Sequence, residues 1–340
     1  RYWSGFDVLA NLWGYAPLGF WLTLAALRTG RRQWAMVGSY DNRVHCVDVR
    51  SGRGVWTYET DNYVNGMPVV SGNVAIFGGC DGILHVIDIA NGKKHSQIEV
   101  GDYIAGTATV DGDRAYLGHY GNAVICVDIK AGKIIWTFRD KGFPYFASPA
   151  IDQGFVVIGG RDRQVHCLEQ TTGKRKWVYK TRGKVDASAT LCDNKVVVGS
   201  EDGTLLILDF ATGKLIWKSY IGGWPFVNGI SVANGFVATG TKSRDRTLIK
   251  ESDGAIVYFS GTMGFDVHMD SAFAGPIFGF GNLVTDASSG RPIAKIGGNA
   301  VKYSILNGDF AVSMDRYLDV YSRHGGNPLV QRTTALGTGS

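Results

Sequence analysis

The chain repeats one turn signal at an almost fixed interval. A small or polar residue followed by glycine recurs every 40 or 41 residues through the first six copies and every 36 residues afterwards. The glycines are Gly52, Gly92, Gly132, Gly173, Gly213, Gly254 and Gly290, with Gly326 as a weaker last copy. A second glycine, at the end of an apolar run, keeps the same interval from Gly38 to Gly279. Two markers in phase indicate repeated structural units, and 340 residues hold eight of them.

The residues inside one repeat have the periodicity of β-strands. In the fifth repeat, apolar runs at residues 195–199, 205–208 and 215–217 are separated by Asp-Gly and Thr-Gly turns, which are hairpin signals. A further run at residues 185–191, rich in Ala and Ser, precedes them. Four strands in about 40 residues are typical of a propeller blade. The sequence therefore predicts an all-β fold, an eight-bladed β-propeller of four-stranded antiparallel blades, rather than a parallel β-helix with shorter rungs.

Small residues recur where the innermost strands of the blades should converge. Small side chains let neighbouring backbones approach closely. These residues are Gly66, Gly106, Ala147, Ser148, Ala187 and Ser188.

An acidic residue, a glycine four positions later and a tryptophan four positions after that form a recurring signature. It occupies residues 48–56, 128–136, 169–177 and 209–217. The signature resembles the Ala-x-Asp-x-x-Thr-Gly-x-x-x-Trp motif of pyrroloquinoline-quinone-type propeller repeats, and the likeness covers about residues 34 to 220. The resemblance implies that each tryptophan docks one blade onto the next. Repeats six to eight lack the tryptophan, and repeat two has His95 near its place.

The composition fits a single packed domain. Hydrophobic residues make up 45% of the chain and charged residues 19%, and 47 glycines supply turns. A closed ring has no internal boundary, so we expect one propeller domain over residues 1–333 and a disordered tail at residues 334–340. The formal charge of +5 comes from scattered Lys and Arg, which argues against a nucleic-acid partner.

Residues 8–27 carry no charge and are long enough to span a bilayer. A proline and two glycines interrupt this stretch, and residues 22–39 fall where the first two strands of repeat one belong. We therefore favour strands over a membrane anchor. On this interpretation residues 6–13 are an extra outer strand that pairs with the last blade and closes the ring.

The cysteines and histidines occupy equivalent positions of different repeats. Cys46, Cys126 and Cys167 lie on separate blades, too far apart for a disulfide, and unpaired thiols favour a reducing compartment. The same separation prevents the third-strand histidines from sharing a metal ion, so we predict a structural role for them and no metal site. These histidines are His45, His85 and His166.

No catalytic constellation is recognisable in the sequence. It lacks the nucleophile elbow, the P-loop, the zinc-binding helix motif and the calcium-loop motif. Quinone-dependent dehydrogenases share the propeller, but the resemblance implies a vicinal Cys pair and a calcium-binding acid and Asn that are not recognisable here. We therefore expect no catalytic residues and no cofactor, with pyrroloquinoline quinone (PQQ) as the alternative.

One position stands out when the repeats are superposed, eleven residues after the signature glycine and at the end of the loop into the next blade. It is aromatic in five of seven repeats. The residues are Tyr63, Tyr103, Phe143, Lys184, Trp224, Phe265 and Val301. Two interpretations stay open: the rings pack between blades, or they form a collar at one channel mouth that grips an extended peptide or a flat ligand. In the second case a polar rim is supplied by Asn65, Lys184, Asp186 and His268.

The fold and the lack of catalytic motifs together favour a non-catalytic binding scaffold. The residues resemble the repeat-propeller scaffolds of bacterial cell envelopes, including outer-membrane assembly lipoproteins. That resemblance implies an envelope or periplasmic location, a protein or peptide partner and a monomeric ring. The alternatives are a quinone-dependent oxidoreductase and the sensor module of a larger signalling protein, and the unpaired cysteines suggest a cytoplasmic location instead.

Overall fold

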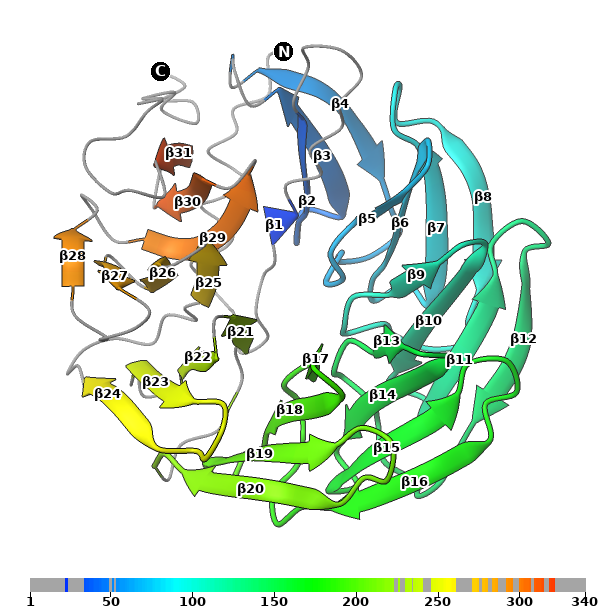
Figure 1. Ribbon diagram of the computed structural model, residues 1–340. Coiled ribbons are helices and arrows are strands. Elements are labelled where there is room, and N and C mark those ends of the chain that lie inside the picture. Colours follow the sequence, from blue (N-terminus) through cyan, green and yellow to red (C-terminus); the bar gives the residue numbers. More distant parts are fainter. Residues whose placement is uncertain are drawn as a thin grey trace. The chain divides into compact units, whose positions relative to one another are not determined.

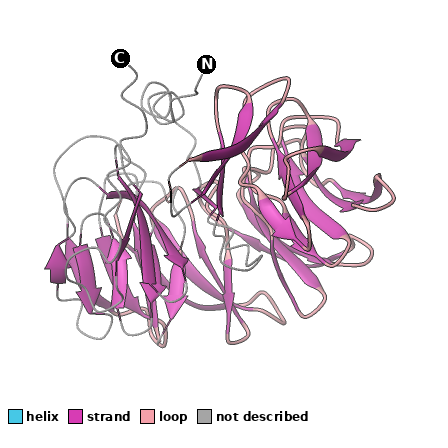
Figure 2. Ribbon diagram, turned by 90° about the horizontal axis from the view of Figure 1, so that it is seen from above, coloured by secondary structure: helices cyan, strands magenta, loops and turns pink. Residues whose placement is uncertain are grey.

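The computed structural model describes residues 22–23, 34–48, 51, 53–222, 226, 230–233, 235–240, 246–260 and the seven later strands. Every element in this part of the chain is a β-strand or a loop, as the colours of Figure 2 show. Within the same residues, none of the elements is a helix long and apolar enough to cross a membrane. The all-β prediction is therefore confirmed for the described residues.

The described strands form separate antiparallel sheets, each built from strands that are consecutive in the sequence (Figure 1). Seven of the sheets described have four strands and one has three. The chain divides into two compact units, Arg1–Lys180 with Leu336–Ser340, and Thr181–Ala335. The closed eight-bladed ring and the single domain over residues 1–333 stay predictions.

The first unit holds four sheets. The first sheet is β1 (Leu22–Thr23), β2 (Trp34–Gly38), β3 (Arg43–Asp48) and β4 (Gly54–Glu59). The second is β5 (Val69–Ser71), β6 (Val74–Gly78), β7 (Ile83–Asp88) and β8 (Lys94–Glu99). The third is β9 (Thr109–Asp111), β10 (Arg114–His119), β11 (Ala123–Asp128) and β12 (Lys133–Phe138). The fourth is β13 (Ala150–Asp152), β14 (Phe155–Gly160), β15 (Gln164–Glu169) and β16 (Arg175–Lys180).

The second unit continues the pattern. Its first sheet is β17 (Thr190–Cys192), β18 (Lys195–Gly199), β19 (Thr204–Asp209) and β20 (Leu215–Tyr220). The next is β21 (Ser231–Ala233), β22 (Phe236–Gly240), β23 (Arg246–Lys250) and β24 (Ile256–Ser260). Then come β25 (Ser271–Ala274), β26 (Ile277–Phe280), β27 (Leu283–Asp286) and β28 (Pro292–Lys295). The last sheet is β29 (Ala300–Leu306), β30 (Asp309–Met314) and β31 (Leu318–Tyr321).

Only a short part of the N-terminal stretch is described. Leu22 pairs with Val37 of β2, which confirms that repeat one has its innermost strand there. Residues 6–13, the rest of residues 8–27 and the tail at residues 334–340 lie outside the described residues.

The acidic residue of each signature holds the turn that follows it. Asp209 Oδ1 accepts hydrogen bonds from the Thr212 backbone N–H at 2.8 Å and from its hydroxyl at 2.6 Å, and these bonds lower the pKa of Asp209. Gly213 follows at φ 69°, a conformation that glycine adopts without strain. Asp48 and Asp128 cap their turns in the same way. The acidic residue and the glycine of the signature thus specify a tight turn.

The signature tryptophans reach from one sheet to the next. Trp136 Nε1 donates to a backbone carbonyl of the fourth sheet at 3.1 Å, and its ring covers Gly173, where an added Cβ would lie 2.6 Å from the ring. Trp56 and Trp217 each make the equivalent hydrogen bond at 2.8 Å. Trp136 is buried, whereas Trp56, Trp177 and Trp217 are half-buried. The docking role is confirmed where these bonds are described, but full burial holds for Trp136 alone among the four.

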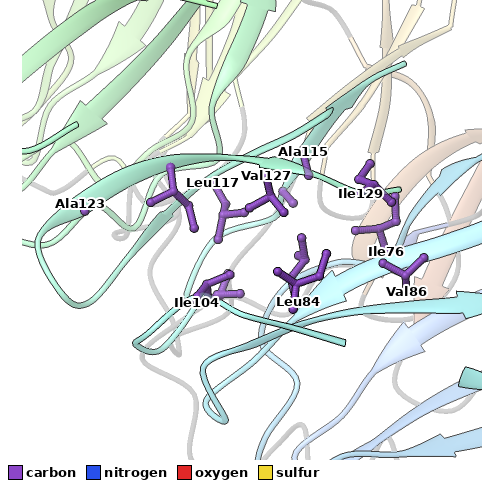
Figure 3. Packing of buried hydrophobic residues seen from close by; sticks show 13 residues of the cluster. Ile76, Leu84, Val86, Ile104, Ala115, Leu117, Ala123, Val127 and Ile129 are labelled. Atoms are coloured by element: carbon purple, nitrogen blue, oxygen red, sulfur yellow. The ribbon is translucent and has the colours of Figure 1, made fainter. Parts of the chain in front are cut away.

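The second and third sheets pack differently, through an aliphatic cluster (Figure 3). Ile76 and Leu84 from the second sheet and Leu117 from the third lie in it, each at most 1% exposed. Ser96, not His95, occupies the place of the docking tryptophan, because Ser96 pairs with the middle of β7 as Trp136 does with β11. His95 is the residue next to this place.

The innermost strands are shorter than the sequence predicts. Only the last two residues of the predicted run at 185–191 belong to β17. The segments that precede these strands are crowded instead: a Cβ on Gly106 would lie 2.5 Å from the Phe146 carbonyl oxygen. Nearby, the Thr107 N–H donates to Ser148 Oγ at 2.9 Å. Small residues therefore bring neighbouring sheets together here, as predicted.

Candidate functional site

Two kinds of connection meet at one end of each sheet in the first unit. They are the turn between the second and third strands and the loop from an outer strand into the next sheet. The Cys80 N–H donates to the Tyr63 carbonyl, and the Tyr120 N–H to the Tyr103 carbonyl, both at 2.8 Å. We call this end the loop end. The signature turns follow the third strands and so lie at the opposite end.

The equivalent hydrogen bond in the fourth sheet shows that Phe143 does not align with Tyr63 and Tyr103. The Arg161 N–H donates to the Pro144 carbonyl at 3.2 Å, so Pro144, and not Phe143, is the equivalent of Tyr63 and Tyr103. The loop before it is one residue longer. The sequence contains a signal for the correct alignment, because an apolar residue that is buried in the structure follows the loop position in each of these four repeats. Those buried residues are Val64, Ile104, Tyr145 and Val185.

Five aromatic side chains gather at the loop end across three successive sheets. We call them the aromatic surface: Tyr40, Tyr63, Tyr103, Tyr120 and Phe143. Tyr40 is half-buried. The other four side chains are about half exposed: Tyr63 48%, Phe143 48%, Tyr103 51% and Tyr120 52%. The three predicted rings among them are therefore accessible to solvent rather than buried between sheets.

The first group of contacts on the aromatic surface surrounds Cys80. The rings of Tyr40 and Tyr63 meet edge to face, with centroids 4.9 Å apart. Asn65 Nδ2, on the same loop as Tyr63, donates to Cys80 Sγ at 2.9 Å. Burial raises the pKa of the Tyr40 hydroxyl and of the Cys80 thiol, so both are neutral at pH 7. This group presents ring faces and a neutral polar edge.

The second group of contacts joins aromatic rings to arginine. The Tyr120 ring lies between Tyr103, with centroids 6.1 Å apart, and the buried ring of Phe146, with centroids 5.3 Å apart. The Arg161 guanidinium carbon lies 4.0 Å from the Phe146 ring centroid, a cation–π contact. Arg139 donates to the Gly121 carbonyl in the turn of Tyr120.

Three of the other residues predicted for the site have described side chains. Asn65 lies in the first unit, beside Cys80. Lys184 and Asp186 belong to the second unit and are half-buried, and the Lys184 carbonyl accepts from the Glu201 N–H at 2.8 Å. Trp224, Phe265, His268 and Val301 have no described side chains.

Sequence reasoning missed the aromatic residues of the turns between second and third strands. Tyr40 and Tyr120 start their turns, and Cys80, Arg161 and Glu201 hold the same place in other repeats. The signal was available, because these residues follow the 40- or 41-residue interval of the repeat.

The third-strand histidines have the structural role that the sequence predicts. His45, His85 and His166 are buried, and each Nε2 bonds the aspartate four residues earlier, at 2.9, 2.7 and 2.8 Å. His85 Nδ1 also lies 3.1 Å from the Tyr58 hydroxyl of the preceding sheet. All five cysteines are free thiols.

One acidic cluster has the spacing of a metal site. Ligand atoms of Asp140, Asp162 and His166 lie within 4.8 Å of one another. Gln164 Nε2 donates to both carboxylates, at 3.1 and 2.8 Å, and Arg175 donates to Asp140 at 2.9 Å. The oxygens that face one another are thus already bound by the chain's own donors, which makes this cluster a charge network.

Comparison with known proteins decides the family. A family model described as "Outer membrane protein assembly factor BamB" matches residues 11–137, 80–224 and 121–274. The chain belongs to this family. Its PQQ-type propeller repeats are those that the sequence signature indicated.

Individual BamB relatives align over short stretches. BamB of Burkholderia pseudomallei is 31% identical over 94 residues, which cover 26% of this chain and 24% of that protein. The 1-butanol dehydrogenase (cytochrome c) of Thauera butanivorans is 32% identical over 83 residues, 21% of this chain and 12% of that protein. The aligned stretches thus span about a quarter or less of these relatives' lengths.

A solved structure supports the fold over a much longer stretch. BamB from Moraxella catarrhalis superposes with a TM-score of 0.72 and 19% identity, covering 88% of this chain and 96% of that chain. The fold is therefore that of a BamB-type β-propeller.

Proposed function

We propose that this protein is a non-catalytic scaffold that binds a protein or peptide partner through the aromatic surface. The observation that carries the proposal is the gathering of four half-exposed rings at one end of three successive sheets. Large, rigid rings supply contact area at low entropic cost and dominate many protein interfaces. The BamB family supports a role in protein assembly at the outer membrane, and so a cell-envelope location rather than the cytoplasmic alternative.

The proposal extends to the whole ring. Eight blades closed by residues 6–13, beside the three-stranded last sheet, would form a monomeric propeller. In that ring Trp224, Phe265 and His268 continue the loop end around one channel mouth, together with Lys184 and Asp186. The repeat interval supports this arrangement.

Site-specific photo-crosslinking tests the surface directly. A photoreactive phenylalanine at Tyr103 or Tyr120 should crosslink to an envelope protein in cells that make the full-length chain. The matched control is the same residue at Lys130 or Lys133, which are exposed at the opposite end. Equal crosslinking from both ends, or none from the loop end, would overturn the proposal.

A quinone-dependent oxidoreductase is the second candidate, favoured by the similarity to the Thauera dehydrogenase. We propose that no quinone cofactor is used. Incubation with PQQ and Ca²⁺, followed by gel filtration, should yield protein without visible quinone absorbance and without dye reduction by alcohols. A stoichiometric bound quinone would favour the enzyme instead.

A further inference from the structure

Basic side chains adjoin the aromatic surface where it meets the fourth sheet. Arg139 and Lys141 lie in the loop into that sheet, and Arg161 and Arg163 lie in its turn between β14 and β15. Arg161 stacks on the Phe146 ring, which in turn contacts the aromatic surface at 5.3 Å. Contacts thus join Arg161 and Arg139 to the aromatic surface, and Lys141 and Arg163 lie in the same loop and turn.

Two carboxylates beside this basic patch are paired with cationic side chains of the chain, and a third accepts a backbone hydrogen bond. Asp140 is paired with Arg175 at 2.9 Å, and buried Asp162 is paired with His166 at 2.8 Å. The Asp102 carboxylate accepts from the Tyr103 N–H at 2.7 Å. Lys141 and Arg163, in contrast, are exposed and have no acidic partner among the described residues. The patch thus presents positive charge to solvent.

The backbone of Arg163 also adopts a conformation that is unfavourable for arginine. It has φ 62°, in the left-handed region where a side chain with a Cβ is strained. The other described repeats place Asn or Gly at this turn position, residues that tolerate it best. They are Asn42, Gly82, Asn122 and Gly203. A strained, exposed arginine, where a simple replacement would remove the strain, points to a function for its charge.

We infer that the partner binds through an extended segment that carries aromatic and carboxylate side chains. Its rings lie on Tyr103 and Tyr120, and its carboxylates bind Lys141 and Arg163. This inference rests on the proposed function and adds the chemistry of the partner. Charge complementarity selects an acidic segment over a neutral one and speeds its association.

Two fluorescent peptides test it by anisotropy, one alternating Phe with Glu and one alternating Phe with Gln. The Glu peptide should bind about tenfold more tightly at low salt, and the difference should shrink at high salt because exposed charges are screened. Equal affinity for both peptides would refute the inference but leave the proposed function standing. Failure of both peptides to bind would count against both.

Variants separate charge from aromatic contact. Arg163→Asn should weaken the Glu peptide about fivefold, leave the Gln peptide unchanged and raise the melting temperature, because Asn suits the turn. Lys133→Gln, at the opposite end, is the matched control and should change neither affinity. Tyr120→Ala should weaken both peptides. If Arg163→Asn leaves the Glu peptide's affinity unchanged, the carboxylate contact is wrong.

Discussion

At the residue scale, the tryptophan of the signature explains how one sheet holds the next. Trp136 combines a buried ring, close contact with Gly173 and a hydrogen bond across the sheets. Trp136→Ala should therefore lower the free energy of unfolding by about 3–5 kcal/mol, whereas Trp56→Ala should cost less because Trp56 is only partly buried. Urea denaturation of both variants measures the difference. Equal losses would mean that the hydrogen bond, and not ring burial, dominates.

A second residue-scale prediction concerns acid. Burial raises the pKa of Asp162, but the hydrogen bond and charge attraction from His166 and the hydrogen bonds from Gln164 together outweigh burial and hold that pKa below its usual range. The pair therefore stabilises the fold above the unfolded-state pKa of about 3.9, and this stability is lost as the pH falls through the folded-state pKa. Asp162→Asn should destabilise at pH 7, with a loss that shrinks below about pH 4. A loss independent of pH would contradict the assignment.

At the scale of the sheet, the sequence predicts the strands well because hairpin turns and apolar runs are local signals. It misplaces single residues where the spacing changes by one. The longer loop before Pro144 shifts Phe143 out of the position that Tyr63 and Tyr103 hold. It also overestimates the innermost strands, because crowding between sheets replaces strand pairing there. The turn aromatics Tyr40 and Tyr120 follow the repeat interval too, but the sequence does not show that their turn meets the loop position at the same end of the sheet.

The missing tryptophan gives an element-scale prediction. Ser96 Oγ is buried without a hydrogen-bond partner, and a Cβ on Gly132 of the third sheet would meet nothing within 4 Å. Ser96→Trp should therefore fill the space between the second and third sheets and stabilise the fold by about 0.5–2 kcal/mol. His95→Trp, at the neighbouring exposed position, is the control. Stabilisation by His95→Trp alone would show that Ser96 does not occupy the place of the docking tryptophan.

At the scale of the molecule, repeats make the fold predictable and leave function to the positions that differ between repeats. The capped signature turns recur with little change, whereas the loop end carries Tyr103 and Tyr120 in one region and Lys184 with Glu201 in another. The repeat interval predicted the loop position, but ring exposure required the packing of neighbouring sheets.

The most direct test of the central claim is the affinity of the crosslinked partner, once identified, for a Tyr103→Ala/Tyr120→Ala double variant. If the two rings are binding hot spots, the double variant should bind the partner at least about tenfold more weakly. Its melting temperature should change little, because both rings are half-exposed. A Lys130→Ala/Lys133→Ala variant at the opposite end should bind as the parent protein does. Unchanged affinity of the tyrosine variant, with the fold intact, would show that the partner binds elsewhere.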